Sequence, residues 1–387
     1  MANGMMEKLL RLMAEKRASD VYLSANSPVL IKINGVCVPV NAQPLPVDGP
    51  LQLLEEIVSA DQFNEFNSTG ELNIAVPLSG VGRFRVSAMR QRGSCAVVVR
   101  FISTDIPSIE SLNIPPVLAE MILAKRGLML VVGATGSGKS TTLASLLDHR
   151  NTNLSGHILT IEDPVEYLFK NKKSIVNQRE VGTDTASLQI ALKNALRQAP
   201  DVILIGEIRD RETMSQAIAY SQSGHLVLAT MHANNSYQAL NRVLNFYPVE
   251  VRPSMLNDLA SALKAIVSQR LLRTVDGGRV PAVEVLVNTR LVSELIEKGD
   301  FFGVREALEK SMAEESQTFE ADLARLVVAG KVDRKEALAY ADSPTNLMWR
   351  LENDIALRQK PGAGPAADEP ETNAGPSFSD FTLDVKH

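Results

Sequence analysis

The apolar positions over residues 5–102 predict a small α+β domain. Residues 5–16 form an amphipathic helical pattern, with four apolar side chains on one face: Met6, Leu9, Leu10 and Met13. A second helix is predicted over residues 51–66. Short apolar runs predict strands over residues 21–23, 29–33, 36–38, 72–76, 83–89 and 96–102. Asn34-Gly35 separates two of these runs and is a strong hairpin turn. We therefore expect a domain over residues 1–104 that carries a sheet with helices on one side.

The pattern changes after a connector with several prolines, which we place at residues 105–116. Uniformly apolar runs of strand length then alternate with helical patterns. The predicted strands are 128–132, 157–161, 174–177, 202–205 and 226–229, and the predicted helices include 187–198 and 211–221. Apolar strands that alternate with helices predict a parallel sheet covered on both faces.

The second domain is predicted to extend over residues 117–358. Its part from residue 251 onward is expected to be mainly helical, around a short hairpin at residues 280–287. Residues 359–387 are rich in Pro, Gly, Ala, Asp, Glu and Ser. Such a segment buries too little apolar surface to fold, so we predict a disordered tail. The expected fold class is α/β.

Composition narrows the classes of function. The net charge of −5 and the pI near 5.7 argue against a nucleic-acid partner. No apolar run reaches the roughly 18 residues of a membrane-spanning helix, and charges interrupt the first helical pattern, so we expect a cytoplasmic protein. The two cysteines, Cys37 and Cys95, form no C-x-x-C motif, which argues against a zinc or disulfide framework. Both lie in apolar runs and are expected to be buried.

A phosphate-binding loop lies between the apolar run 128–132 and a helical pattern. Its residues match G-x-x-x-x-G-K-[ST]: Gly133, Ala134, Thr135, Gly136, Ser137, Gly138, Lys139, Ser140 and Thr141. Backbone N–H groups at such a helix N-terminus bind anions. Lys139 is expected to reach the β- and γ-phosphates of ATP, and the Ser140 hydroxyl to bind Mg²⁺.

Carboxylates follow two of the predicted strands. Glu162, Asp163 and Glu166 come at the end of the run 157–161. They could orient or deprotonate an attacking water, although alone they could also form a solvated acidic turn. Glu207 comes just after the run 202–205, where an acid can be placed beside Mg²⁺.

Two of the five histidines, His225 and His232, bracket the predicted strand 226–229. No further ligands are spaced for a zinc site. Hydrogen bonding to a phosphate or to a carboxylate explains the pair better. Two structural histidines remain the alternative.

Together, these motifs resemble the ATPases of the type II/type IV secretion superfamily, within the group that retracts type IV pili. The resemblance covers residues 5–355. Residues 133–141 match the Walker A loop of that family and residues 161–167 resemble its Asp box. Further matching segments are a family signature at 176–181, an atypical Walker B motif at 206–210 and a His box at 224–227 and 230–233.

The resemblance implies a PAS-like N-terminal domain joined to a RecA-like ATPase domain, assembled as a homo-hexameric ring. It implies that Glu166 is the general base and that Glu207 holds a Mg²⁺-bound water. Arginines of the N-terminal domain reach the γ-phosphate in this family, and Arg85 and Arg100 match them best. A guanidinium suits this role because it forks onto phosphate oxygens, although both could instead be solvated charges on a strand face.

We also assign His232 to the catalytic set, and Glu162 and His225 to nucleotide contacts. The chain lacks the four-cysteine zinc insertion and the long N-terminal extension usual in extension and secretion ATPases. This favours a retraction ATPase.

Two segments favour the PilU-type branch of the family. A retraction motif typical of PilT aligns with residues 291–296, but its central Arg-Asn is replaced by Ser293-Glu294, and residues 342–351 resemble PilU. We therefore expect an accessory motor that works with a PilT-type ATPase and a platform protein at the inner-membrane base of the pilus. The alternatives are a pilus-assembly or secretion ATPase, a low-turnover nucleotide-gated scaffold, and a DNA translocase.

Overall fold

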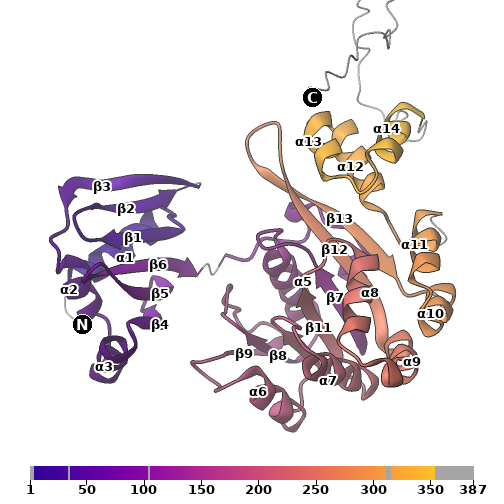
Figure 1. Cartoon of the computed structure of the whole chain (residues 1–387), viewed down its shortest axis with the longest axis horizontal. Coiled ribbons are helices and arrows are strands. Elements are labelled where there is room, and N and C mark those ends of the chain that lie inside the picture. Colours follow the sequence, from indigo (N-terminus) through magenta and orange to yellow (C-terminus); the bar gives the residue numbers. More distant parts are fainter. Residues whose placement is uncertain (1–3, 34, 103–104, 311–314, 354–387) are drawn as a thin grey trace, which may run out of the picture.

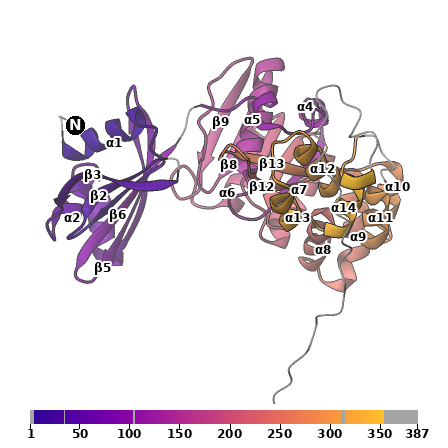
Figure 2. The same cartoon turned by 90° about the horizontal axis from the view of Figure 1, so that it is seen from above.

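The computed structural model describes residues 4–33, 35–102, 105–310 and 315–353. These residues form two separate sheets with helices, at opposite ends of the molecule (Figures 1 and 2). The predicted α/β class is confirmed. The tail predicted for residues 359–387 lies outside the described residues, as does Asn34 of the predicted hairpin turn.

The first sheet is antiparallel, with strand order β3-β2-β1-β6-β5-β4. Its strands are β1 (Asp20–Ser24), β2 (Pro28–Ile33), β3 (Val36–Pro44), β4 (Glu71–Leu78), β5 (Gly82–Gln91) and β6 (Ser94–Ile102). Its helices are α1 (Met5–Glu15), α2 (Gly49–Glu55) and α3 (Ala60–Thr69). Met6 of α1, Leu54 of α2 and Phe66 of α3 share one core with the inward side chains of the sheet, so the helices cover one face.

The single helix predicted over residues 51–66 is in fact two helices, α2 and α3. Ser59 ends the gap between them, because its hydroxyl accepts from the Gln62 N–H while the Gln62 side chain accepts from the Ser59 N–H. This reciprocal cap starts a new helix at Ala60. The burial predicted for the cysteines holds for Cys95 and is wrong for Cys37, which lies on the exposed edge strand β3.

The second core begins before residue 117. Ile109 and Ile114, in the predicted connector, are buried against Met129 and neighbouring side chains of the second domain. The connector also contains a short helix, η1 (Glu110–Leu112). The chain is thus anchored to the second domain from about Ile109 onward.

The second sheet has the strand order β13-β12-β7-β11-β10-β8-β9 and is parallel except for the edge strand β13. Its strands are β7 (Gly127–Val132), β8 (Gly156–Glu162), β9 (Ser174–Glu180), β10 (Val202–Ile205), β11 (Leu226–Met231), β12 (Leu263–Arg273) and β13 (Arg279–Val287). Leu130 faces one core and Met129 and Val131 face another, so the sheet is covered on both sides as predicted.

The helices of this part are α4 (Val117–Met121), α5 (Lys139–Asn153), α6 (Leu188–Ala195), η2 (Leu196–Gln198), α7 (Arg211–Gln222), α8 (Ser236–Asn245), η3 (Val249–Val251), α9 (Arg252–Ala262), α10 (Arg290–Glu297), α11 (Phe301–Glu309), α12 (Phe319–Val328), α13 (Arg334–Tyr340) and α14 (Pro344–Asn353). Helix α5 packs on one face of the sheet, and α6, α7 and α9 pack on the other. Among the residues that the structure describes, no helix is both long and apolar enough to cross a membrane.

The hairpin predicted at residues 280–287 is longer than expected. Its first strand, β12, was not predicted, and it pairs in parallel with β7 and antiparallel with β13. The hairpin formed by β12 and β13 therefore belongs to the second sheet. Helices α12, α13 and α14 pack on it through a core of their own, which includes Leu272, Phe319 and Leu347.

Candidate active site

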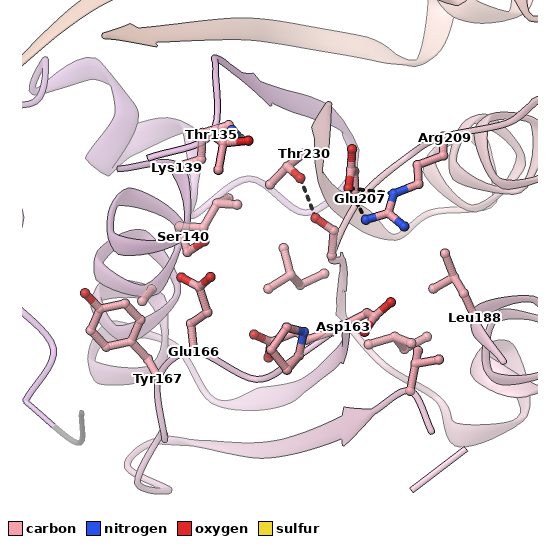
Figure 3. Close-up of a pocket in the computed structure, with 18 of the residues that line it drawn as sticks. Thr135, Lys139, Ser140, Asp163, Glu166, Tyr167, Leu188, Glu207, Arg209 and Thr230 are labelled. Carbon is pink, nitrogen blue, oxygen red and sulfur yellow. Dashed lines mark hydrogen bonds and ion pairs between the residues drawn. The ribbon is translucent and has the colours of Figure 1, made fainter. Parts of the chain in front are cut away.

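The carboxyl ends of four neighbouring parallel strands meet at one edge of the second sheet. The phosphate loop follows β7, the Asp-box residues follow β8, Glu207 follows β10 and His232 follows β11. Together they line a cavity of about 810 Å³ (Figure 3). The crevice outside the carboxyl ends of the strands is where open α/β sheets bind their ligands.

The phosphate loop lies tightly against strand β12. Gly138, directly before α5, has a left-handed φ of 87°. A Cβ atom at Gly138 would lie 2.8 Å from Nε2 of Gln269, and one at Gly133 would lie 2.5 Å from the Gln269 carbonyl oxygen. Only glycine fits such close approaches. Loop residues and the first turn of α5 line the cavity, and backbone N–H groups at such a helix N-terminus bind anions.

Gln269 of β12 was not predicted as a site residue. It is almost completely buried. Its Nε2 donates to the Ser137 carbonyl oxygen at 2.8 Å, and its Oε1 accepts from the Thr142 hydroxyl at 2.8 Å. One side chain thus holds both the phosphate loop and the first turn of α5.

Lys139 lies between backbone carbonyls and acidic side chains. Its Nζ donates to the carbonyl oxygens of Gly133 and Ala134, at 2.8 and 2.9 Å. Burial lowers the pKa of Lys139, and the negative charges of Glu207 and Glu166 partly oppose this effect. Lys139 is thus a partly desolvated cation close to both predicted catalytic acids.

Glu166 and Glu162 have different surroundings. Glu166 is exposed, and Figure 3 shows its carboxylate pointing toward Ser140. The Oε1 atom of Glu162 accepts from the Thr160 hydroxyl at 2.6 Å and from Gln178 at 3.2 Å. Burial raises the pKa of Glu162. The structure thus brings Glu166 toward the phosphate loop, while Glu162 is held in the wall of the cavity by protein partners.

The segment that carries Glu166 is fixed at several points. The Tyr167 hydroxyl lies 2.9 Å from the Thr141 hydroxyl of α5. Gln178 of β9 donates to the Tyr167 carbonyl at 2.8 Å, and Glu180 accepts from the Val165 N–H at 3.0 Å. Gln178 and Glu180 belong to the family signature at 176–181, so this signature positions the general base predicted in the sequence.

Glu207 has two cationic or potentially cationic neighbours. Its Oε1 lies 3.1 Å from Nε2 of His232, and its Oε2 accepts from Nε of Arg209 at 2.7 Å. This hydrogen bond raises the pKa of Arg209. The Thr230 hydroxyl donates to the Gly206 carbonyl, which fixes the backbone before Glu207 (Figure 3). The predicted association of His232 with a carboxylate is therefore seen, and Arg209 is a partner that was not predicted.

His225 lies at the other end of β11. The six-residue strand β11 separates it from His232. The two histidines therefore lie about 20 Å apart, at opposite ends of this strand. The His225 ring nitrogen Nδ1 contacts the Ser223 hydroxyl and the Tyr220 carbonyl, both at 3.2 Å. His225 is not among the cavity residues. Within one chain, the predicted contact between His225 and the nucleotide is not supported.

Comparisons with known proteins agree with this geometry. A family model described as type II/IV secretion system protein matches residues 4–279. The chain is 46% identical to the type IV pilus ATPase PilU of Pseudomonas aeruginosa over 363 residues, which cover 94% of this chain and 93% of PilU. It is 37% identical to the retraction ATPase PilT of the same organism over 339 residues, which cover 88% of this chain and 98% of PilT.

A solved structure of the pilus retraction motor PilT with bound ADP matches with a TM-score of 0.83 and 37% identity. The match covers 89% of this chain and 99% of that chain. The chain belongs to the PilT/PilU family of type IV pilus ATPases. It is accordingly an ATP hydrolase with a RecA-like domain.

In this pilus ATPase, Arg85 and Arg100 are direct neighbours on β5 and β6. Phe84 and Val86 are buried in the N-terminal core, so Arg85 lies on the opposite face of the sheet. Arg100 donates to Asp20 at 2.9 Å, and this hydrogen bond raises the pKa of Arg100. Neither arginine lines the cavity of its own chain.

Arg83 forms a contact between the two domains of this pilus ATPase. Arg83 lies 3.8 Å from Glu180 of β9, at the strand that holds the Glu166 segment. Arg85 and Arg100 were predicted to reach the γ-phosphate, and Arg83 was not predicted as a site residue.

Proposed function

We propose that this protein hydrolyses ATP to power the retraction of type IV pili. One observation carries the proposal: the phosphate loop, Glu166 and Glu207 converge on one cavity at the carboxyl edge of the sheet. The identity to PilU and PilT supports the coupling of this hydrolysis to pili.

Each site residue has a role in this proposal. The loop N–H groups and Lys139 bind the phosphates and stabilise the charge that develops on them. Glu166 accepts a proton from the attacking water. His232 and Arg209 orient the Glu207 carboxylate through the contacts described above.

The donors near the phosphate loop suit Mg²⁺ bound together with ATP. Among the described residues, no cluster of three or more His, Cys, Asp or Glu side chains could hold a metal ion by itself. Mg²⁺ at ATP needs few protein ligands, because phosphates and waters supply most of its oxygens. The Ser140 hydroxyl would bind it directly and Glu207 through a water. When bound, Mg²⁺ neutralises phosphate charge.

We further propose a homo-hexameric ring with active sites between subunits. Arg85 and Arg100 do not line the cavity of their own chain, although Arg100 lies within electrostatic range of Glu166, and we assign both to the site of a neighbouring subunit. A head-to-tail contact of this kind closes into a ring when the rotation permits. The resemblance to the family sets the number at six.

The subclass we propose is a PilU-type accessory motor. The identity to PilU is 46% and the identity to PilT is 37%. Ser293 and Glu294 lie on α10, where the PilT motif has Arg-Asn. We expect the motor to act with a PilT-type ATPase and a platform protein at the inner-membrane base of the pilus, and to need no nucleic acid.

The test measures phosphate release from MgATP by the purified protein, with and without a PilT-type ATPase or single-stranded DNA. We expect turnover, stimulation by the PilT-type partner and no response to DNA. Lys139→Ala should abolish turnover, because a clamp on the transferring phosphate contributes several kcal/mol to the transition state. Unchanged turnover in Lys139→Ala would refute the site, and stimulation by DNA would favour a translocase.

A further inference from the structure

The side chains of β12 alternate between two parts of the molecule. Gln269 contacts the phosphate loop, and Leu271 lines the cavity beside that loop. Arg270 and Leu272 instead contact the C-terminal helices α12, α13 and α14 or the segments that join them. Successive residues of a strand point to opposite faces, so β12 has one face on the nucleotide site and the other on the C-terminal helices.

The contact on the nucleotide side depends on the orientation of the Gln269 amide. The Ser137 carbonyl can only accept a hydrogen bond, so the amide nitrogen must face it. The amide oxygen is then left to accept from the Thr142 hydroxyl. Both contacts are buried, where an unpaired polar group is costly. Gln269 therefore selects one arrangement of the loop relative to α5.

The contact on the other side is made by Arg270. Its guanidinium donates to the Asp342 carboxylate, to the Tyr340 carbonyl and, at 3.1 Å, to the Asn234 carbonyl. It also lies over the Phe319 ring, 3.8 Å from the ring centroid. Asp342 lines a second cavity of about 290 Å³ and is not part of the nucleotide cavity.

We propose that Gln269 is a positioning residue for nucleotide binding and that Arg270 couples it to the C-terminal helices. Docking of Asp342 on Arg270 fixes the position of β12, and β12 fixes the phosphate loop through the neighbouring Gln269. The inference rests on the proposed function, because it assumes that the phosphate loop binds ATP.

The first experiment compares Gln269→Leu and Gln269→Glu with the wild type. ADP binding and MgATP turnover are measured on the full chain. Leucine removes both hydrogen bonds, and glutamate keeps the size but loses the donor to Ser137. The loss of a buried hydrogen bond predicts a rise of about tenfold in the dissociation constant of ADP and in KM for ATP. Because the contact lies in the loop in every bound state, kcat should change much less than KM.

A matched control is Gln317→Leu. Gln317 also donates its amide to a backbone carbonyl, that of Val283 at 2.7 Å, but it contacts β13 and lies away from the phosphate loop. The Gln317→Leu variant should have a lower melting temperature than the wild type and an unchanged KM for ATP. Wild-type ADP affinity in both Gln269 variants would overturn the positioning role. A fall in melting temperature alone would mean that Gln269 only stabilises the fold.

The second experiment tests the coupling through Arg270. Asp342→Asn should weaken ADP binding although Asp342 lies outside the nucleotide cavity. The double variant Gln269→Leu, Asp342→Asn should bind ADP no more weakly than Gln269→Leu alone, since residues in one network are not additive. Asp333→Asn, which alters the cap of α13 without touching Arg270, should leave the affinity unchanged. If the losses of ADP affinity in the two single variants multiply in the double variant, the two residues act independently and the coupling is contradicted.

These outcomes separate the inference from the proposed function. If Lys139→Ala retains turnover, the nucleotide site itself is wrongly assigned. If Lys139→Ala is inactive while Gln269→Leu and Gln269→Glu bind ADP normally, only the role of Gln269 fails.

Discussion

The Oε1 atom of Glu207 lies 3.1 Å from Nε2 of His232. The two residues follow adjacent parallel strands, β10 and β11, so the sheet itself sets their separation. Arg209 holds the other carboxylate oxygen. With both oxygens held, the Glu207 carboxylate has a defined orientation at the edge of the cavity.

This arrangement predicts that His232→Ala lowers turnover without abolishing nucleotide binding. Loss of a residue that orients a metal-site carboxylate typically costs about 10- to 100-fold in activity. Steady-state phosphate release and ADP binding measure the two effects. His225→Ala is the control, because it changes a histidine at the far end of the same strand. Equal losses in both variants would contradict the assignment.

Glu166→Gln should bind ATP and fail to hydrolyse it, because an amide cannot accept the proton of the attacking water. Glu162→Gln should retain most of its turnover, since its partners Thr160 and Gln178 can still bond an amide. A quench-flow measurement of a single turnover would separate binding from hydrolysis. Normal hydrolysis by Glu166→Gln together with a loss in Glu162→Gln would move the general base to Glu162.

Arginines that act between subunits predict recovery of activity in mixed rings. Lys139→Ala protein and an Arg85→Ala, Arg100→Ala double variant should each be inactive alone. In a random equal mixture, about one interface in four pairs an intact loop with intact arginines of the neighbour. Phosphate release should therefore reappear on mixing.

The control for this experiment is Arg90→Ala. Arg90 lies on the same strand as Arg85 but contacts Asn67 and the Phe66 ring of α3, so this variant should keep its turnover. A mixture that stays inactive, although mass spectrometry shows that the subunits have mixed, would argue against arginines supplied by the neighbour.

Glu284 predicts a dependence of stability on pH. It is buried on β13, where it accepts from the Ser236 N–H at 2.7 Å and the Ser268 hydroxyl at 2.9 Å. Burial raises its pKa, so in a window above the ordinary glutamate range the folded protein binds more protons than the unfolded chain. Stability should therefore fall as the pH rises through this window.

Glu284→Gln should remove this loss of stability at higher pH. The amide of the new glutamine does not titrate, and its oxygen can accept the same hydrogen bonds. The melting temperature of the variant relative to the wild type should rise as the pH increases through this window. Glu250→Gln, at an exposed position, should show no such trend. A constant difference between Glu284→Gln and the wild type across this range would contradict the prediction.

The predicted site residues that the structure brings together at the cavity lie in local motifs. The phosphate loop needs only a strand, a glycine-rich turn and a helix, which are consecutive in the chain. Glu207 follows an apolar strand directly. Both patterns are visible in short windows, so they could be assigned without knowledge of the fold.

Gln269 could not be assigned in this way. Its partners Thr142 and Ser137 are 127 and 132 positions away in the sequence. Strand β12 was missed for a related reason, because its buried polar residues, such as Ser268 and Gln269, interrupt the apolar run that marks a buried strand. Each is satisfied by a distant partner that only the folded chain supplies.

The position of His225 could have been deduced from the sequence. A strand rises about 3.3 Å per residue. A predicted strand between two histidines therefore already places them at opposite ends of that strand. Because the two histidines belong to one motif, both were assigned to the nucleotide site, His232 to the catalytic set and His225 to a nucleotide contact. Strand geometry, applied before the motif, would have kept only His232 at the site.

Strand β7 lies between β11 and β12, which follow it by about a hundred residues and more along the chain. The strand that leads into the phosphate loop therefore has no neighbour in its own sheet until much later sequence has been synthesised. Pairings between such distant segments form slowly during folding. We expect a nascent chain to gain nucleotide affinity only after β12, up to Arg273, has left the ribosome. Affinity for ATP would then report that the strands on both sides of β7 have paired with it.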